Sequence, residues 1–274
     1  MTRDEAVIRF QRLHDRDGAF VIPNPWDVGT ARVLAGLGFE ALATTSAGFA
    51  FSQGVSEGNL TPGAVLQHCR DMAAATGLPV SADLENGFGH DPETVAELIR
   101  YAAETGLAGG SIEDFTGDLG APIYAFDHAV ERIQAAVEAA ASIDGGFVLT
   151  ARAENFLHGR KDLDDTIKRL QAFEAAGADV LYAPGLADLE TIRTVTHSVT
   201  KPVNVVMGLP GATFGVTELA AAGVKRISVG SALSRHMFQG FIRAAREMLD
   251  DGTFTFANDA MGFKPLDDMF KGFK

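Results

Sequence analysis

The stretch Gly177-Ala178-Asp179-Val180-Leu181-Tyr182 joins the expected end of a helix to the expected start of a buried strand. Glycine suits the left-handed backbone position that ends many helices, and an apolar run without alternation suits a strand that is covered on both faces. The same pattern occurs three more times, at residues 38–43, 106–112 and 223–229. We interpret each stretch as the joint between a helix and a strand of a parallel sheet.

Further expected strands lie between these joints, at residues 19–22, 79–83, 147–152 and 202–207. Eight parallel strands within 274 residues predict a single α/β domain, a (β/α)₈ TIM barrel that spans residues 1–274. A doubly wound open sheet would alternate strands and helices in the same way. That fold has a glycine-rich G-x-G-x-x-G turn after its first strand, and this sequence lacks the turn.

Several signals mark the expected helices. Thr61 followed by Pro62 indicates a helix start, as does Pro92, and apolar residues recur at helical spacing over residues 129–141 and 163–176. Thr2 and Glu5 have the spacing of a capping box, so residues 1–17 are expected to form a leading helix that closes the bottom of the barrel.

The C-terminal residues 232–274 are expected to be helical. Within this segment, residues 250–274 contain more aromatic residues than a free tail would expose, namely Phe254, Phe256, Phe263, Phe270 and Phe273. We therefore expect this segment to dock on a partner subunit.

Composition restricts the class of protein. The net charge of −13, from 36 acidic and 23 basic residues, argues against nucleic acid or an anionic membrane as the main partner. The sequence has neither a membrane-spanning apolar run nor a signal peptide's apolar core, so a cytoplasmic protein is expected. The single cysteine, Cys69, excludes an internal disulfide, and we interpret it as structural.

Acidic residues gather where two expected strands end. Asp83 and Glu85 follow the third strand and, on an extended chain, would point to the same side, while Glu113 comes from the neighbouring strand end. Three converging carboxylates would repel one another unless a hard divalent cation joined them, which predicts Mg²⁺, with Mn²⁺ as a substitute. Alternatively, these acids cap helices or pair with surface lysine and arginine.

Other strand ends carry candidate substrate-binding groups. Arg152, at the end of the fifth strand, could hold a substrate carboxylate bidentately or could instead pair with Glu113 or Glu154. The small residues 44–48 could present backbone N–H groups and the Ser46 hydroxyl to an oxyanion. Residues 230–231 resemble a barrel phosphate site, although a plain strand-to-helix turn explains them equally well.

The sequence resembles the isocitrate lyase/phosphoenolpyruvate mutase superfamily from about residue 20 to residue 233. The resemblance is carried by Pro23-Asn24-Pro25-Trp26-Asp27, Asp83-Leu84-Glu85-Asn86-Gly87-Phe88-Gly89, Ser111-Ile112-Glu113-Asp114 and Ala151-Arg152-Ala153-Glu154. It implies a barrel whose last helix is exchanged between subunits of a homodimer or homotetramer. It also implies Mg²⁺ and a small 2-oxo acid substrate or its enolate.

The resemblance assigns roles to individual residues. Asp83 would bind the metal directly, Glu85 and Glu113 directly or through waters, and Glu57 in the outer shell; Glu85 stands where most relatives have Asp. The residues expected to bind substrate are Trp26, Asp27, Ser46, Ala47, Gly48, Arg152 and Asn204. Asp83 and Arg152 are the expected catalytic residues.

The loop at residues 114–128 departs from the best-known members of the superfamily. It contains neither Cys nor Lys, which argues against isocitrate lyase chemistry through a loop cysteine, and it lacks the Lys- and Asn-bearing loop of the phosphonate enzymes. It resembles instead a divergent branch that includes oxaloacetate decarboxylase-like enzymes. Tyr124, His128 and His158 are candidate proton donors.

Three functions remain open at this point. The first is a Mg²⁺-dependent carbon–carbon lyase or decarboxylase that acts on a small 2-oxo or 2-hydroxy dicarboxylate through an enolate. The second is a phosphoenolpyruvate phosphonomutase or a phosphonopyruvate hydrolase. The third is a non-catalytic paralogue that binds 2-oxo acids.

Overall fold

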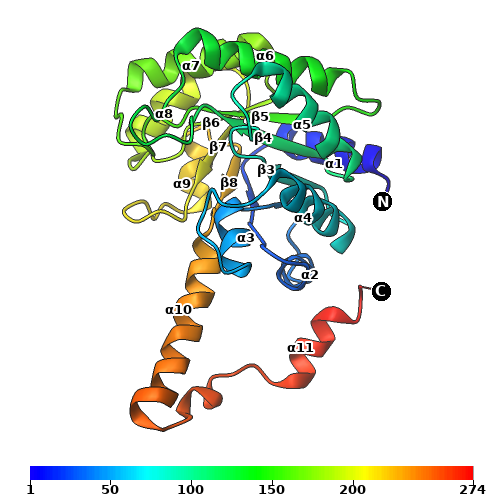
Figure 1. Ribbon diagram of the computed structural model, residues 1–274, viewed down its shortest axis with the longest axis vertical. Helices are drawn as coiled ribbons and strands as arrows, with labels where there is room; N and C mark the ends of the chain where they lie inside the picture. Colours follow the sequence, from blue (N-terminus) through cyan, green and yellow to red (C-terminus); the bar gives the residue numbers. More distant parts are fainter. Residues whose placement is uncertain (274) are drawn as a thin grey trace.

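A computed structural model describes residues 1–273 and shows eight parallel strands that alternate with helices around a barrel (Figure 1). The strands are β1 (Phe20–Ile22), β2 (Leu42–Ala43), β3 (Val80–Asp83), β4 (Gly109–Glu113), β5 (Val148–Arg152), β6 (Val180–Tyr182), β7 (Val203–Val206) and β8 (Arg226–Ser228). They pair in the order β1-β8-β7-β6-β5-β4-β3-β2. The amide of Ala43 donates to the carbonyl of Pro23 at 3.1 Å and joins the two ends of this series. The predicted barrel is confirmed, and the open sheet is excluded.

The helices cover the outside of the barrel (Figure 1). They are α2 (Val28–Gly36), α3 (Ser46–Ser52), α4 (Pro62–Ala75), α5 (Pro92–Glu104), α6 (Phe126–Ala141), α7 (Leu163–Ala176), α8 (Leu189–His197) and α9 (Val216–Ala221). The predicted starts at Pro62 and Pro92 are confirmed, and α6 begins before the predicted residue 129. Gly177 ends α7 with a φ of 106°, as the joint between helix and strand requires.

The bottom of the barrel is closed by α1 (Arg3–Asp15). Thr2 and Glu5 form the capping box of this helix. The helix buries Val7, Phe10 and Leu13 against the first residues of the strands, which include Phe20. This end of the barrel is therefore a packed apolar plug.

A C-terminal arm of residues 232–273 leaves the barrel (Figure 1). It consists of α10 (Ala232–Arg246), a π-helical turn at Glu247–Asp251, a 3₁₀ turn at Thr255–Asn258 and α11 (Phe263–Phe270). The arm returns to α2, where the guanidinium of Arg32 lies 5.9 Å from the ring centre of Phe273. Between these contacts it exposes large apolar side chains, and Phe241 is 66% exposed and Leu249 84% exposed.

Two further features bear on the class of protein. Cys69 is completely buried in α4, and this burial raises the pKa of its thiol to about 12, in keeping with a structural role. Within residues 1–273, no helix combines the length and the apolar character needed to cross a membrane.

Candidate active site

A cavity of about 240 Å³ opens at the carboxyl ends of the strands, where barrel enzymes carry their reactive groups. Among the residues predicted for the site, those that line it are Thr44, Thr45, Ser46, Ala47, Glu57, Asp83, Arg152, Asn204, Gly230 and Ser231. The cavity is smaller than the pockets that hold drug-sized ligands, so it suits a small metabolite.

Asp83 lies on the cavity wall and contacts two neighbouring elements. Its Oδ2 accepts hydrogen bonds from the amide of Ser46 at 3.2 Å and from the hydroxyl of Ser46 at 2.9 Å. Its Oδ1 accepts from Nη1 of Arg152 at 2.9 Å, and its own amide donates to the hydroxyl of Thr44 at 2.9 Å. Asp83 is therefore held between the first turn of α3 and the end of β5.

Arg152 lies at the centre of the acidic residues. Nη1 contacts Asp83 at 2.9 Å, Nη2 contacts Oε2 of Glu113 at 3.0 Å, and Nε donates to Oε1 of Glu154 at 2.8 Å. The ion pairs of Arg152 with Glu113 and Glu154, predicted as the alternative to binding a substrate carboxylate, are thus present, together with a contact to Asp83. The guanidinium also lies 5.1 Å from the ring centre of Tyr182. The positive charge of Arg152 compensates part of the negative charge of these three carboxylates.

Glu85 lies just beyond the strand rather than on it. β3 ends at Asp83, and Glu85 has a φ of 51°, so the chain is not extended here and the expected geometry of the pair was wrong. The carboxylate remains close to Asp83, because burial and then the Asp83 charge raise the pKa of Glu85 to about 7. Within the described residues, its Oε1 is buried without a hydrogen-bond partner.

Glu113 and Glu57 complete the acidic cluster. The amide of Glu113 donates to the carbonyl of Glu85 at 3.0 Å, which places these two strand ends side by side. Burial raises the pKa of Glu113 well above its usual value, against the opposing charge of Arg152. Burial and the charge of Asp83 also raise the pKa of Glu57, whose Oε1 lies 3.4 Å from the Ser46 hydroxyl.

The acidic cluster fits a hard divalent cation by its donor chemistry. Asp83, Glu57, Glu85 and Glu113 offer only oxygen donors, which Mg²⁺ and Mn²⁺ prefer, and the unpartnered Oε1 of Glu85 lacks the positive partner that a cation would provide. Across residues 1–273, no three acidic, His or Cys side chains already stand in the spacing of a metal cage. In this arrangement the guanidinium of Arg152 is the positive charge that contacts Asp83 and Glu113.

The segment predicted to bind an oxyanion forms the first turn of α3. Ser46 and Ala47 line the cavity, whereas Gly48 lies behind them. The Thr45 hydroxyl accepts from the amide of Gly48 at 3.2 Å and caps the helix. A Cβ on Gly48 would stand 2.6 Å from Cγ2 of Thr45 and 3.3 Å from Cβ of Trp26, so this position requires glycine for close packing.

Other predicted residues occupy different places. Trp26 is buried and packs beside Gly48, outside the cavity lining. Asp27 is exposed and caps α2 by accepting from the amide of Thr30 at 2.7 Å. By contrast, Gly230 and Ser231, at the turn that resembled a phosphate site, line the cavity, and the amide of Gly230 donates to Oδ1 of Asn24 at 3.0 Å.

The three candidate proton donors do not line the cavity. The Tyr124 hydroxyl forms a hydrogen bond of 2.6 Å with Nδ1 of His90, and His128 bonds the carbonyl of His90 at 3.0 Å. His158 stacks on Phe115, with ring centres 3.9 Å apart. In this arrangement the three side chains organise the loop that follows β4.

Several residues that were not predicted for the site also line the cavity, and Tyr182 and Arg226 are the two of them with large polar side chains. Both lie in strands, where an inward polar side chain has little structural reason to occur. The signal was present in the joint at residues 223–229, because a buried apolar strand contains an arginine there. Tyr182 is partly buried, and desolvation of its phenol raises the pKa to about 12.

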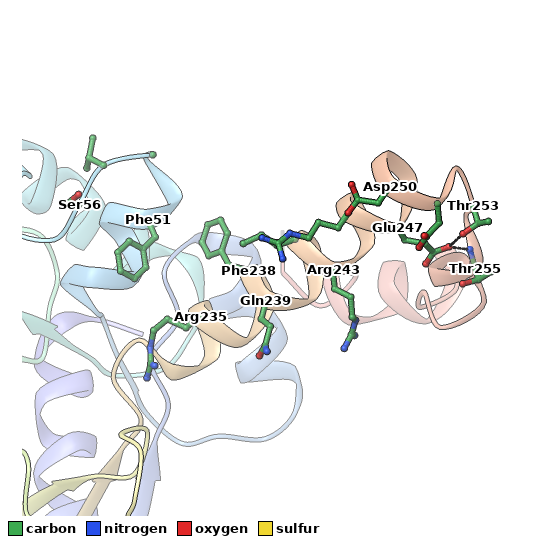
Figure 2. Close-up of a pocket in the computed structure, with 15 residues that line it drawn as sticks. Phe51, Ser56, Arg235, Phe238, Gln239, Arg243, Glu247, Asp250, Thr253 and Thr255 are labelled. Carbon is green, nitrogen blue, oxygen red and sulfur yellow. Dashed lines mark hydrogen bonds between the residues drawn. The ribbon is translucent and has the colours of Figure 1, made fainter.

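A second and larger hollow, of about 1290 Å³, lies beside the C-terminal arm rather than at the strand ends (Figure 2). Phe51 and Val55 near α3 line it, together with Phe238 and Ile242 of α10. At the tip of the arm, Glu247 accepts a hydrogen bond from the Thr253 hydroxyl at 2.9 Å. Charged residues of the arm also line this hollow, namely Glu247, Asp250, Asp251, Arg235, Arg243 and Arg246.

Comparison with known proteins agrees with a lyase or mutase built on this barrel. The model of the phosphoenolpyruvate phosphomutase family matches residues 10–249. Oxaloacetate decarboxylase of Paraburkholderia xenovorans (strain LB400) is 30% identical over 230 residues, covering 81% of this chain and 75% of the relative. 2-Methylisocitrate lyase of Halalkalibacterium halodurans is 28% identical over 229 residues, covering 81% and 73%.

A solved structure from Burkholderia cenocepacia J2315, whose description assigns it only to the lyases or mutases, is 59% identical. Its TM-score is 0.96, and the match covers 98% of this chain and 96% of that one. The chain therefore belongs to the phosphoenolpyruvate phosphomutase family, within the isocitrate lyase/phosphoenolpyruvate mutase superfamily. The predicted resemblance is confirmed.

Proposed function

We propose that this protein is a Mg²⁺-dependent carbon–carbon lyase or decarboxylase that acts on a small 2-oxo or 2-hydroxy dicarboxylate through an enolate. The observation that carries the proposal is the position of Asp83, which contacts both the first turn of α3 and Arg152 inside a small polar cavity. Carboxylate, helix N-terminus and guanidinium are the groups that a metal-bound dianion would need. Oxaloacetate decarboxylase and 2-methylisocitrate lyase are among the relatives.

In this proposal the acidic residues would bind the cation, and the hydrogen-bond donors would bind the substrate. Asp83, Glu85 and Glu113, with Glu57 further out, would hold the cation, with Mn²⁺ as a substitute for Mg²⁺. When bound, the cation supplies positive charge that favours an enolate oxygen. Ser46 and Ala47 would present hydroxyl and amide donors to the substrate carboxylate and oxo oxygen.

Arg152 would bind the same substrate carboxylate, with Asn204 as a further contact in the cavity. Because Arg152 contacts Asp83, Glu113 and Glu154 in this structure, a cation that binds the first two would free part of the guanidinium for the substrate. Loading the cation and binding the anion are therefore expected to be coupled.

The proposal is tested by calorimetric titration of oxalate, a mimic of the pyruvate enolate, into the protein with and without Mg²⁺. We expect binding only with the metal, and this result would justify assays of oxaloacetate and substituted malates for turnover. Absence of binding in both conditions would refute the site. Tight binding without turnover of any of these acids would indicate a non-catalytic binding paralogue.

A second candidate function is a phosphoenolpyruvate phosphonomutase or phosphonopyruvate hydrolase. It is favoured by the matching family model, which is described as phosphoenolpyruvate phosphomutase. ³¹P NMR of phosphonopyruvate incubated with enzyme and Mg²⁺ separates the two candidates. Loss or migration of the carbon–phosphorus signal would favour this second function, and an unchanged signal would favour the first.

We further propose that the C-terminal arm is exchanged between subunits of a homodimer or homotetramer. Its apolar side chains Phe241 and Leu249 are 66% and 84% exposed, although a lone chain gains stability by covering such groups. The hollow beside α10 offers an apolar surface to the arm of a second copy. Sedimentation of the wild type and of Phe241→Asp tests this: we expect an oligomer and a monomer, respectively.

A further inference from the structure

Arg226 is a buried cation at the floor of the cavity. It is only 5% exposed and lies at the start of β8, with its guanidinium 6.0 Å from the ring centre of Phe10 in α1. Its Nε donates to Oδ1 of Asn204 at 2.9 Å, and its Nη2 donates to the hydroxyl of Thr150 at 2.9 Å. Both partners are neutral, so neither compensates its charge.

No ion pair within residues 1–273 includes Arg226, and its Nη1 is buried without a hydrogen-bond partner. Two other arginines within residues 1–273 are buried, Arg132 in α6 and Arg169 in α7, and their hydrogen bonds differ from those of Arg226. Arg169 pairs with Asp114 at 3.1 Å and with Asp165 at 2.8 Å. Arg132 also has neutral partners, but its Nη1 and Nη2 both donate to backbone carbonyls, so neither is left without a hydrogen bond as Nη1 of Arg226 is. An unpaired buried charge is costly, so a missing anionic partner is the simplest reason for this one to persist.

The sheet register shows where that partner would lie. In the register of the strands, Arg152 lies opposite Tyr182, Tyr182 opposite Asn204, and Asn204 opposite Arg226. The four residues therefore form one row across β5 to β8. All four line the cavity. A cation stands at each end of the row, and only Arg152 has carboxylates of the protein around it.

We propose that the guanidinium of Arg226 binds the second carboxylate of the substrate, at the floor of the cavity and below Asp83 and Arg152. This inference rests on the proposed function, because the first carboxylate is the one assigned there to Ser46, Ala47 and Arg152. It makes Arg226 the residue that distinguishes dicarboxylates from monocarboxylates. Desolvation lowers the pKa of Arg226 to about 10, which still leaves the side chain charged at neutral pH.

Lactate and malate are suitable probes because they differ chiefly by one carboxylate. Both are titrated calorimetrically, with Mg²⁺ present, into the wild type and Arg226→Gln, and oxalate is titrated as a control for the metal-dependent half of the site. We expect the wild type to prefer malate over lactate by roughly 10- to 100-fold. Arg226→Gln should lose most of that preference and keep its affinity for oxalate.

Lys225→Met is the matched control, because it removes a positive charge at the neighbouring position, where the ammonium bonds the carbonyl of Arg16 outside the cavity. It should keep the preference for malate. Asn204→Asp is a second test that does not depend on Arg226→Gln folding. It would place a carboxylate beside Nε of Arg226, supply the missing counter-charge internally and thereby also reduce the preference for malate.

The outcomes are distinguishable. If oxalate does not bind the wild type, the proposed function fails before Arg226 is tested. If oxalate binds but both variants keep the wild-type ratio of malate to lactate affinity, the assignment of Arg226 is overturned. Equal loss of oxalate and malate binding in folded Arg226→Gln would also overturn it, because Arg226 would then support the shared end of the site.

Discussion

At the bottom of the barrel, α1 packs Phe10 and His14 against Phe20, whereas at the top Arg152 stands among three carboxylates. The bottom keeps its one ionisable ring neutral, because burial lowers the pKa of His14 to about 3. The top holds acids whose pKa values burial raises, and that of Glu85 reaches about 7. One end is arranged for stability and the other retains charges that oppose folding, as expected where a site awaits ligands.

The largest expected effect is at the bottom. Phe10→Ala removes a fully buried ring from the plug and should lower the free energy of unfolding by about 3–5 kcal/mol. Urea denaturation of wild type and variant measures this loss. The affinity for oxalate of the folded protein should stay within about twofold of the wild type, since the plug lies away from Asp83. A stability loss below about 1 kcal/mol would contradict the role assigned to α1.

The next largest effect is at the top of the barrel, where a substitution is expected to weaken ligand binding and to leave stability nearly unchanged. Asp83→Asn should weaken Mg²⁺-dependent oxalate binding by roughly 100-fold, about 2.7 kcal/mol, because it removes a direct ligand of the cation. The free energy of unfolding without metal should change little, because the lost pair with Arg152 is offset by relief of like charge on Glu57 and Glu85.

Asp164→Asn is the control for that experiment. It removes the same charge from an exposed position in the first turn of α7, at the same end of the barrel, and should leave oxalate binding unchanged. If Asp83→Asn retained wild-type affinity for Mg²⁺ and oxalate, the assignment of the metal site would be wrong.

The third prediction concerns the pH dependence of stability, which has opposite signs for His14 at the bottom of the barrel and Glu85 at the top. The folded pKa of His14 lies below the ordinary 6.5, so its contribution to stability is present above pH 6.5 and is lost as pH falls toward 3. The raised pKa of Glu85 acts oppositely, since stability is lost as pH rises from about 4.5 to about 7.

His14→Leu should therefore flatten the acid side of the stability profile, by up to about 1.4 kcal/mol for each pH unit below 6.5. Denaturation at pH 7.5 and at pH 5.5 measures this difference in both proteins. The profiles of wild type and variant would run parallel if His14 were not responsible. The contribution of Glu85, between about pH 4.5 and pH 7, should be the same in both proteins.

The smallest effect is expected at the rim of the bottom end. Arg16 and Glu40 form an exposed pair, with Nη2 and Oε2 2.6 Å apart. Glu40→Gln should lower the free energy of unfolding by less than about 1 kcal/mol, because solvent screens such pairs. A loss above 2 kcal/mol in thermal unfolding would show that surface charge, and not only the apolar plug, stabilises this end.

The fold was predictable because each joint repeats a local rule. The pattern around Gly177 depends only on neighbouring residues, and so do the caps at Thr61 and Thr2, which lie where the sequence placed them. The register that aligns Arg152 with Arg226 depends on how strands pair around the barrel, and no local pattern specifies it.

The site was predictable in its composition but not in its geometry. Asp83 and Arg152 line the cavity as their positions at strand ends predicted, and Asn204 lines it as the family resemblance implied. The left-handed backbone of Glu85, however, could not be predicted from its spacing to Asp83. Side-chain direction is set by contacts across the barrel. For the same reason the sequence could not show that the hydroxyl of Tyr124, a candidate proton donor, bonds His90 outside the cavity lining.

Gly48 lies where three segments that are distant in the sequence come together. A Cβ there would meet Thr45 at 2.6 Å, Trp26 at 3.3 Å and Ser234, at the start of the arm, at 3.4 Å. This position therefore has to satisfy the substrate-facing turn and the foot of α10 at the same time. Substitutions in this turn that alter substrate specificity are therefore expected at Ser46 and Ala47, because a substitution at Gly48 would also disturb the packing of α10.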